Sequence, residues 1–359
     1  MIHNADGNLL EADVDALVNT VNTVGVMGKG IALQFKQAFP GNFKAYAKAC
    51  KADRVQPGSM FVYDNGRLEQ PKLIINFPTK RHWRSKSRIE DIESGLVDLI
   101  RVVRELRIES IALPPLGCGN GGLDWSDVEP LIVEAFSAVP DVDVHLFAPV
   151  GTPQESDMRI GTARPPMTVG KAALVALMAR YQRSAETFDG VSQVELQKLM
   201  YFQQAAGELL NLKYAKAQYG PYADNLNFVL QRIEGHFVRG AGGRSRTVHE
   251  FGALEVLDGA WEEAESFLSN MASTTERMDE VLELVAGFES PYGLELLSSV
   301  HWIATNDDPT AQDDLDRAIA GIRSWNRRKD RLFTDRHITV AWNHLRSATG
   351  EWLSRPAVA

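Results

Sequence analysis

The sequence is poor in cysteine and has no long apolar segment. Only Cys50 and Cys118 occur in 359 residues, too few for a disulfide framework or a cysteine metal cluster. No apolar run reaches the roughly 18 residues that a membrane-spanning helix needs. The polar N-terminus, MIHNADGN, lacks the pattern of a signal peptide. These absences predict a protein of the reduced cytoplasm, with neither a metal nor a cofactor.

Basic residues are almost missing from one stretch of the chain. Residues 250–316 contain 17 acidic side chains and a single basic one, Arg277, whereas the whole chain has a net charge of −9. Helices of one sign lack the ion pairs that stabilise helical surfaces. The stretch is therefore expected either to be solvated surface or to meet a basic partner.

Two glycine-rich segments, residues 22–31 and 117–123, each follow an apolar run. Glycine allows backbone N–H groups to approach a phosphate closely, and a following helix adds a partial positive charge. The first segment is not a nucleotide-triphosphate loop, because Lys29 is followed by Gly30, and neither segment is a GxGxxG fingerprint. As a pair they predict a diphosphate site at the carboxyl ends of strands.

Apolar runs and helical spacing alternate through the first part of the chain, which predicts a three-layer α/β/α domain. The predicted strands are residues 15–20, 73–77, 110–116 and 144–150, and the predicted helices are 31–39 and 90–106.

The remainder of the chain is predicted to be mainly α-helical. The domain boundaries are 1–152 for the α/β domain, 153–167 for a Pro- and Gly-containing linker and 168–359 for the helical domain. Helical spacing is found in residues 170–183, 193–211, 223–234, 259–271, 275–288 and 312–326, and residues 335–345 are helical or mixed.

Residues 1–152 resemble a macrodomain, the α/β/α module with a mixed sheet that binds ADP-ribose. The similarity lies in GNLLEADVDALVN, NTVNTVGVMGKGIALQFKQAFPG, LIINFPTK and ALPPLGCGNGGLDW. The segments MGKGIALQF and PTKRHW are most similar to the DarG antitoxins and to relatives that remove ADP-ribose from carboxylates. The resemblance implies an ADP-ribose site formed by Asn8, Leu9, Gly28, Lys29, Gly30, Ile31, Gly117, Cys118, Gly119, Asn120, Gly121, Gly122 and Leu123.

Two positions depart from the family pattern. Most macrodomains have an aspartate where this chain has Asn8, so the resemblance implies softer recognition of adenine. Relatives that act on protein carboxylates have an aspartate in the second loop, at the position of Gly121. Cys118 is interpreted as a small loop residue rather than a nucleophile, because no histidine lies near it in the sequence.

Lys80 and Asn22 are the predicted catalytic residues. The matching lysine in the antitoxins lies beside the anomeric carbon, and a partly desolvated lysine can serve as acid or as nucleophile. An asparagine can both donate to and accept from ribose hydroxyls. The alternatives are a surface lysine that starts a basic loop and an asparagine that only forms a turn.

Residues 80–88 form a basic run with one aromatic side chain in an otherwise acidic protein. Arg81, Trp83 and Arg84 are predicted to contact single-stranded DNA, because cations and a stacking ring suit such a strand. The alternative is a solvated loop.

In the helical region, LQKLMYFQQ (196–204) and KAQYGPYADNL (216–226) resemble the Panacea domain of toxin–antitoxin systems, although an ordinary helical pair fits equally well. The likeness to DarG antitoxins implies a DarT-like toxin as partner, whose basic DNA groove the acidic region would occupy by DNA mimicry. The predicted function is an antitoxin that hydrolyses ADP-ribose from thymidine in single-stranded DNA. The alternatives are a non-catalytic ADP-ribose reader and a hydrolase of protein-linked or small-molecule ADP-ribose.

Overall fold

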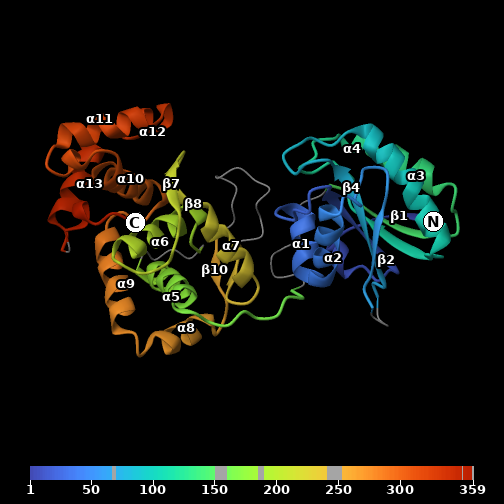
Figure 1. Cartoon of the computed structure of the whole chain (residues 1–359), viewed down its shortest axis with the longest axis horizontal. Coiled ribbons are helices and arrows are strands. Elements are labelled where there is room, and N and C mark those ends of the chain that lie inside the picture. Colours follow the sequence, from blue (N-terminus) through green and yellow to red (C-terminus); the bar gives the residue numbers. More distant parts are fainter. Residues whose placement is uncertain (67–69, 150–159, 185–189, 241–252, 350, 358–359) are drawn as a thin grey trace. The chain divides into compact units, whose positions relative to one another are not determined.

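The chain folds into two compact units that meet between Ala163 and Arg164 (Figure 1). The computed structural model describes residues 1–66, 70–149, 160–184, 190–240, 253–349 and 351–357. The predicted linker, residues 153–167, spans the boundary, but residues 153–159 lie outside the described part. Gly161 still contacts the first unit, where its N–H donates to the carbonyl of Gln37. Arg164 pairs with Glu263 of the second unit.

The first unit contains a six-stranded mixed sheet, in the order β1-β6-β5-β2-β4-β3. Every neighbouring pair is parallel except β3 and β4, which are antiparallel. The strands are β1 (Ile2–Ala5), β2 (Ala16–Asn22), β3 (Phe61–Asp64), β4 (Leu73–Lys80), β5 (Ser110–Leu113) and β6 (Asp143–Phe147). β2 and β4 are buried along nearly their whole length, as expected for central parallel strands.

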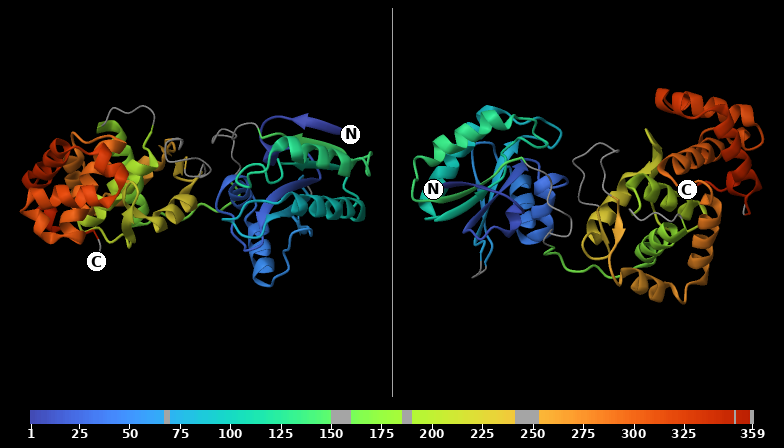
Figure 2. Two further views of the ribbon diagram at one scale, coloured as in Figure 1. Left: turned by 90° about the horizontal axis from the view of Figure 1, so that it is seen from above. Right: turned by 180° about the vertical axis from the view of Figure 1, so that it is seen from behind.

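Helices cover both faces of this sheet, which confirms the predicted three-layer architecture (Figures 1 and 2). The helices α1 (Gly30–Ala38) and α2 (Pro40–Lys51) lie on one face, and α3 (Ile89–Glu105) and α4 (Trp125–Phe136) on the other. Side chains alternate along β2 accordingly: Val18 belongs to the core under α3 and α4, and Leu17 to the core under α1.

The sheet differs from the sequence prediction at its ends and edges. The strand predicted over 110–116 stops at Leu113, since Pro114 and Pro115 have no N–H to donate to a neighbour. The strand predicted over 73–77 continues to Lys80. The edge strands β1 and β3 were not predicted, because neither is the continuous apolar run of a buried strand.

The second unit is mainly helical, as predicted. Its helices are α5 (Val169–Ser184), α6 (Gln193–Ala205), α7 (Asp224–Ile233), α8 (Ala260–Leu268), α9 (Ala272–Val285), α10 (Pro291–Trp302), α11 (Leu315–Trp325), α12 (Arg327–Leu332) and α13 (Asp335–Ser347). Two short hairpins join them, formed by β7 (Tyr214–Ala217) with β8 (Gly220–Ala223) and by β9 (Val238–Arg239) with β10 (Glu255–Val256). A π-helical turn (Ile303–Asp307) follows α10.

Several features of this unit differ from the prediction, among them the short helix α12 and both hairpins, which were not predicted. Helix α6 ends at Ala205 instead of residue 211, just before Gly207, whose φ of +96° ends the helical path. Helix α10 was missed because it is buried on nearly all sides and so shows no amphipathic period. The sequence reading placed only a break at Gly220-Pro221, where the structure has the β7–β8 hairpin.

The two segments that resemble the Panacea domain pack directly against each other. The side chain of Gln197 donates to the carbonyl of Ala223 and accepts from its N–H, so it bonds to the edge of β8. The hydroxyl of Tyr214 donates to the carbonyl of Gln197 at 3.1 Å. Lys198 donates to the carbonyl of Pro221 at 2.5 Å. Helix α6 and the hairpin therefore form one polar, buried joint.

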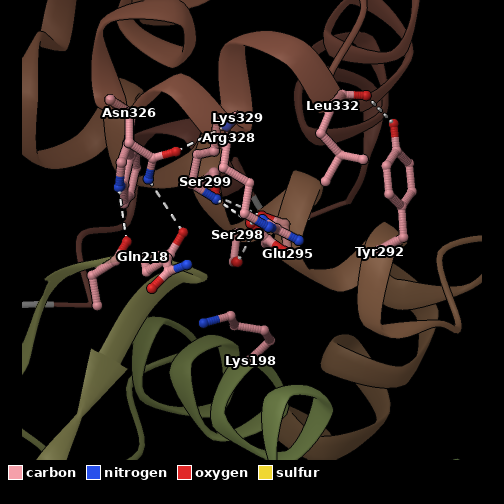
Figure 3. Close-up of polar contacts among 12 residues, drawn as sticks. Lys198, Gln218, Tyr292, Glu295, Ser298, Ser299, Asn326, Arg328, Lys329 and Leu332 are labelled. Carbon is pink, nitrogen blue, oxygen red and sulfur yellow. Dashed lines mark hydrogen bonds and ion pairs between the residues drawn. The ribbon is translucent and has the colours of Figure 1, made fainter. Parts of the chain in front are cut away.

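A buried charged cluster extends this joint to α10 and α12 (Figure 3). Glu295, which is 2% exposed, accepts from Lys329 at 2.5 Å and from Arg328 at 2.6 Å. Lys329 also donates to Ser299. Burial, with Lys329 nearby, lowers the pKa of Lys198 to about 7, and burial lowers that of Lys329 to about 8. The carboxylate of Glu295 thus pairs with two cationic side chains and acts on the third amine, that of Lys198, only through its charge.

The acidic stretch is compensated in part from within the helical unit, so its composition does not by itself require a basic partner. Cations from outside the stretch pair with its acids: Arg164 with Glu263, Arg180 with Glu265 and Asp279, Lys216 with Asp307, Arg317 with Asp308 and Asp314, Arg328 and Lys329 with Glu295, Arg346 with Asp313, and Arg355 with Glu280. The net charge of residues 250–316 does not reveal these pairs, because the cations lie elsewhere in the sequence.

Candidate functional site

Asn22 and Lys80 end two adjacent parallel strands, and the sheet register pairs them directly. A β-bulge between Val21 and Asn22 shifts the register at this point. The sequence prediction placed both residues at strand ends but could not show that the strands are neighbours. The structure brings the two predicted catalytic residues together at the carboxyl edge of the sheet, where α/β folds hold ligands.

Lys80 bridges from β4 to the second glycine loop. Its ammonium group donates to the backbone carbonyl of Asn120. Partial burial lowers the pKa of Lys80 below its usual range, with no carboxylate in the described residues forming an ion pair with it. A lysine in this setting gives up its proton more readily than a solvated one.

Asn22 organises the first loop. Its amide oxygen accepts from the N–H groups of Val24 at 3.1 Å and Val26 at 3.3 Å, and its amide nitrogen donates to the carbonyl of Val26. The hydroxyl of Tyr46 donates to the backbone carbonyl of Asn22. The side chain of Asn22 thus shapes the loop, and it would have to exchange one of these bonds to reach a ribose.

The first glycine loop offers backbone donors at the start of α1. The N–H groups of Gly28 and Lys29 meet no acceptor in the described parts of the chain, and Gly30 and Ile31 open the helix. Gly30 has a φ of +56°, a conformation that favours glycine. A helix N-terminus with unpaired donors is a ready site for a phosphate.

The second glycine loop faces the first. A Cβ added at Gly30 would stand 3.2 Å from the side-chain nitrogen of Asn120, so the loops nearly touch. The N–H groups of Gly119, Asn120 and Gly121 find no acceptor in the described residues, whereas those of Gly122 and Leu123 bond within the loop. A Cβ at Gly119 or Gly122 would meet open space. The two loops therefore present free donors around a shared space.

Gly121 occupies a position that is closed to any side chain. A Cβ there would lie 2.0 Å from the carbonyl oxygen of Gly117 and 2.4 Å from the hydroxyl of Ser87. An aspartate at this position, as in relatives that act on carboxylates, would not fit this loop conformation. The departure noted in the sequence thus has a steric reason.

The remaining ligand residues lie as follows. Asn8 is the N-cap of the short 3₁₀ turn Leu9–Glu11, where its side chain accepts from the N–H of Leu10, and Leu9 is buried. The thiol of Cys118 donates to the carbonyl of Leu116, and burial, with Asp124 and Asp127 nearby, raises its pKa to about 11. A thiol with that pKa is a poor nucleophile near neutral pH, in keeping with a loop residue.

The basic run contains one residue that is held by an ion pair and an exposed aromatic stack. Arg81 forms a two-pronged ion pair with Asp91 of α3, at 2.6 and 2.9 Å, so it fixes the loop to the helix. Trp83 is 44% exposed, stacks on His82 and carries the guanidinium of Arg84 over its ring at 4.5 Å. The predicted DNA contacts therefore differ in their partners: all three side chains are exposed, but Arg81 is held by Asp91, whereas Arg84 forms no ion pair within the described residues.

Sequence reasoning missed three residues that shape this site. Tyr46 holds the backbone of Asn22 from helix α2, and Thr23 donates to the carbonyl of Arg81 at 2.6 Å, which ties the two strand-end loops together. Ser87 lies beneath the second glycine loop. Tyr46 belongs to a helix that was not predicted, and Ser87 was grouped with the solvated run, so neither carried a signal.

The described residues contain no group of three or more His, Cys, Asp or Glu side chains that could hold a metal ion. No helix among them is long and apolar enough to cross a bilayer.

Comparisons with known proteins agree with this geometry. The Macro domain family model matches residues 18–132, so the first unit is a macrodomain. A DNA ADP-ribosyl glycohydrolase from Thermus aquaticus is 46% identical over 360 residues, which cover 99% of this chain and 97% of the relative. One from Mycobacterium tuberculosis is 44% identical over 354 residues, 96% of this chain and 99% of the relative. The chain belongs to the DNA ADP-ribosyl glycohydrolase family.

Among solved structures, the macrodomain of Mycobacterium tuberculosis DarG is 62% identical. It covers 42% of this chain and 98% of its own, with a TM-score of 0.41. A Thermosipho africanus protein described as a DNA ADP-ribosyl transferase–DNA ADP-ribosyl glycohydrolase fusion is 34% identical over 160 residues, 40% of this chain and 41% of the relative.

Proposed function

We propose that this chain is an antitoxin that hydrolyses ADP-ribose from thymidine in single-stranded DNA. The observation that carries the proposal is the placement of Lys80, which has a lowered pKa and lies between two glycine loops with free N–H donors. The relatives that match nearly the whole chain are named for this activity. The reaction is proposed to occur in the cytoplasm, where Cys50 and Cys118 would remain free thiols.

The loops bind and the lysine acts on the leaving group. Backbone donors from Gly28–Ile31 and Gly119–Gly121 hold the diphosphate, which orients the ribose toward the strand ends. Lys80 donates a proton to the departing thymine as the bond between the thymine nitrogen and the anomeric carbon breaks. Water then adds to that carbon, and the proton that it loses returns to the Lys80 amine. Asn22 contacts the ribose, and Asn8 and Leu9 meet the adenine.

The exposed aromatic stack extends the site toward the DNA strand. Trp83 and Arg84 offer a ring and a cation on the loop that follows Lys80, an arrangement that suits an unpaired base and its phosphate. Arg81 contributes by fixing this loop through Asp91.

The test is release of ADP-ribose from an oligonucleotide modified on thymine, compared with release from a peptide modified on glutamate. Release from DNA alone is expected, because no carboxylate fits at position 121 to support the second reaction. Tight ADP-ribose binding without release from either substrate would identify a reader instead. Preferred release from the peptide or from a small ADP-ribose derivative would identify the other hydrolase.

The second half of the antitoxin role is assigned to the helical unit. We propose that it binds a DarT-like DNA ADP-ribosyltransferase through acids that the unit itself does not pair, in part by DNA mimicry. Support comes from the fusion relative, whose name joins the two activities in one chain. Exposed Glu262 on α8 and Glu276 on α9 form no ion pair within the described residues, whereas Asp308 and Asp314 share Arg317.

A matched pair of full-length variants tests the toxin surface. Glu262→Gln with Glu276→Gln should slow association with the toxin, and the effect should shrink as salt rises, because exposed charges are screened within about 8–10 Å. Asp308→Asn with Asp314→Asn serves as the control. Equal association rates for both double variants, or binding of toxin that DNA does not reduce, would contradict the proposed mimicry.

A further inference from the structure

Ser87 has a buried hydroxyl group without a partner. The residue is 7% exposed, and its side-chain oxygen has no hydrogen-bond partner in the described residues. A buried hydroxyl that makes no hydrogen bond costs free energy, so a protein rarely keeps one without a use. The residue lies between the end of the basic run and helix α3, and none of the roles assigned above uses it.

This hydroxyl is aimed into the second glycine loop. The backbone N–H of Ser87 donates to the carbonyl of Gly121 at 3.0 Å, so the loop already rests on this residue. The hydroxyl oxygen and the carbonyl oxygen of Gly117 both lie within 2.4 Å of the point where a Gly121 Cβ would stand. That carbonyl accepts only a 3.2 Å bond from the N–H of Leu123 and has a second lone pair available.

The same loop determines where the catalytic lysine is held. Asn120, next to Gly121, provides the carbonyl that accepts from Lys80. If the loop shifts on Ser87, the carbonyl of Asn120 shifts with it, because Asn120 and Gly121 are adjacent. The ammonium group of Lys80, which bonds to that carbonyl, is then displaced.

We infer that Ser87 is a positioning residue for this site: its hydroxyl donates to the carbonyl of Gly117 when the loop closes on the diphosphate, and the closed loop sets the position of Lys80. The inference rests on the proposed function for its catalytic part. Its binding part needs only ADP-ribose as the ligand. The hydroxyl makes no bond in the described conformation, so a bond that forms only in the closed loop would stabilise the closed loop alone.

The test compares full-length Ser87→Ala with Ser94→Ala. Ser94 lies on α3 in the same unit, and its hydroxyl already donates to the carbonyl of Asp91 without ligand. Ser87→Ala should leave the ligand-free melting temperature unchanged or slightly higher, and should weaken ADP-ribose binding by about five- to tenfold, the worth of one hydrogen bond. Ser94→Ala should show the reverse, a lower melting temperature and an unchanged affinity.

Turnover adds a second readout. With ADP-ribosylated oligonucleotide, Ser87→Ala should lower kcat as well as raise KM, because Lys80 is displaced, and Ser87→Cys should restore part of both through its weak S–H donor. If Ser87→Ala destabilises the ligand-free protein and leaves affinity and kcat unchanged, the hydroxyl is structural and the inference is wrong. If the wild type releases no ADP-ribose from DNA, the proposed function fails, while the ADP-ribose affinities still decide the role of Ser87.

Discussion

The two units use a lysine with a lowered pKa in different ways. In the macrodomain, Lys80 ends a strand at the rim of the sheet and bonds to one loop carbonyl. In the helical unit, Lys329 is fully buried and bonds to Glu295 and Ser299, while Lys198 bonds to Pro221. All three have a lowered pKa because of burial. The three lysines differ in their access to solvent. The amine of Lys80 can meet a substrate, whereas those of Lys198 and Lys329 are buried and connect elements of the unit.

The largest expected effect is a loss of stability in the helical unit when its shared carboxylate, that of Glu295, is removed. Glu295→Ala leaves Lys329 and Arg328 without their acceptor, and an uncompensated buried charge typically costs about 3–5 kcal/mol. Calorimetry should show loss of the helical unit's transition, while ADP-ribose still stabilises the macrodomain. The control is Glu280→Ala, whose partly exposed pair with Arg355 is worth about 0–1 kcal/mol. Equal effects of both variants would show that the cluster is not structural.

The corresponding change in the macrodomain should leave the fold intact. Lys80→Ala is expected to reduce release of ADP-ribose from modified DNA by at least about 10²-fold, the usual loss when a general acid is removed. Affinity for ADP-ribose should change little, because the diphosphate donors are backbone groups, and the melting temperature should be nearly constant. Lys72→Ala, which removes an exposed partner of Asp15, is the control for charge. Unchanged turnover in Lys80→Ala would exclude the lysine from the chemistry.

Two glycine variants distinguish the role of the second loop in binding ADP-ribose from its role in the stability of the unit. Gly119→Glu should abolish ADP-ribose binding with little loss of stability, because its Cβ enters open space while its charge enters the phosphate site. Gly121→Ala should instead destabilise the unit, since its Cβ collides with Gly117 and Ser87. Thermal melting with and without ADP-ribose measures both. Normal stabilisation of Gly119→Glu by the ligand would place the phosphates elsewhere.

The smallest expected effect is a pH dependence that Lys198 gives to the helical unit. Its pKa is about 7 in the folded protein, against 10.5 for a solvated lysine, so between these values the unfolded state binds more protons. The free energy of unfolding should therefore rise with pH above about 7. Denaturation at pH 7 and pH 9 should show a smaller rise for Lys198→Met than for the wild type or for the exposed control Lys213→Met. An identical rise in all three proteins would contradict the low pKa.

The sequence predicted those features of the fold and the site that depend on local patterns of residues. Apolar runs identified β2 and β4, and glycine placement identified both loops, because these signals are local. The neighbour relation between Asn22 and Lys80 could not be predicted from the residues alone, since it depends on which strands pair. The family resemblance supplied it.

Burial and pairing between distant residues explain which elements and contacts the sequence did not predict. Helix α10 lacks a polar face, so its pattern carried no period. The pairing of Arg81 with Asp91 depends on how α3 packs after the basic run. The charge balance of the acidic stretch depends on cations that are up to about a hundred residues away, such as Arg180 for Asp279.

The crowding around Gly121 limits how an enzyme of this kind could change its substrate. A single substitution to aspartate, which would bring a carboxylate into the loop, meets the carbonyl of Gly117 and the hydroxyl of Ser87 at once. A chain with this loop is therefore expected to lose stability when Gly121 alone becomes aspartate, so a carboxylate at this position requires a different path of the loop over Ser87.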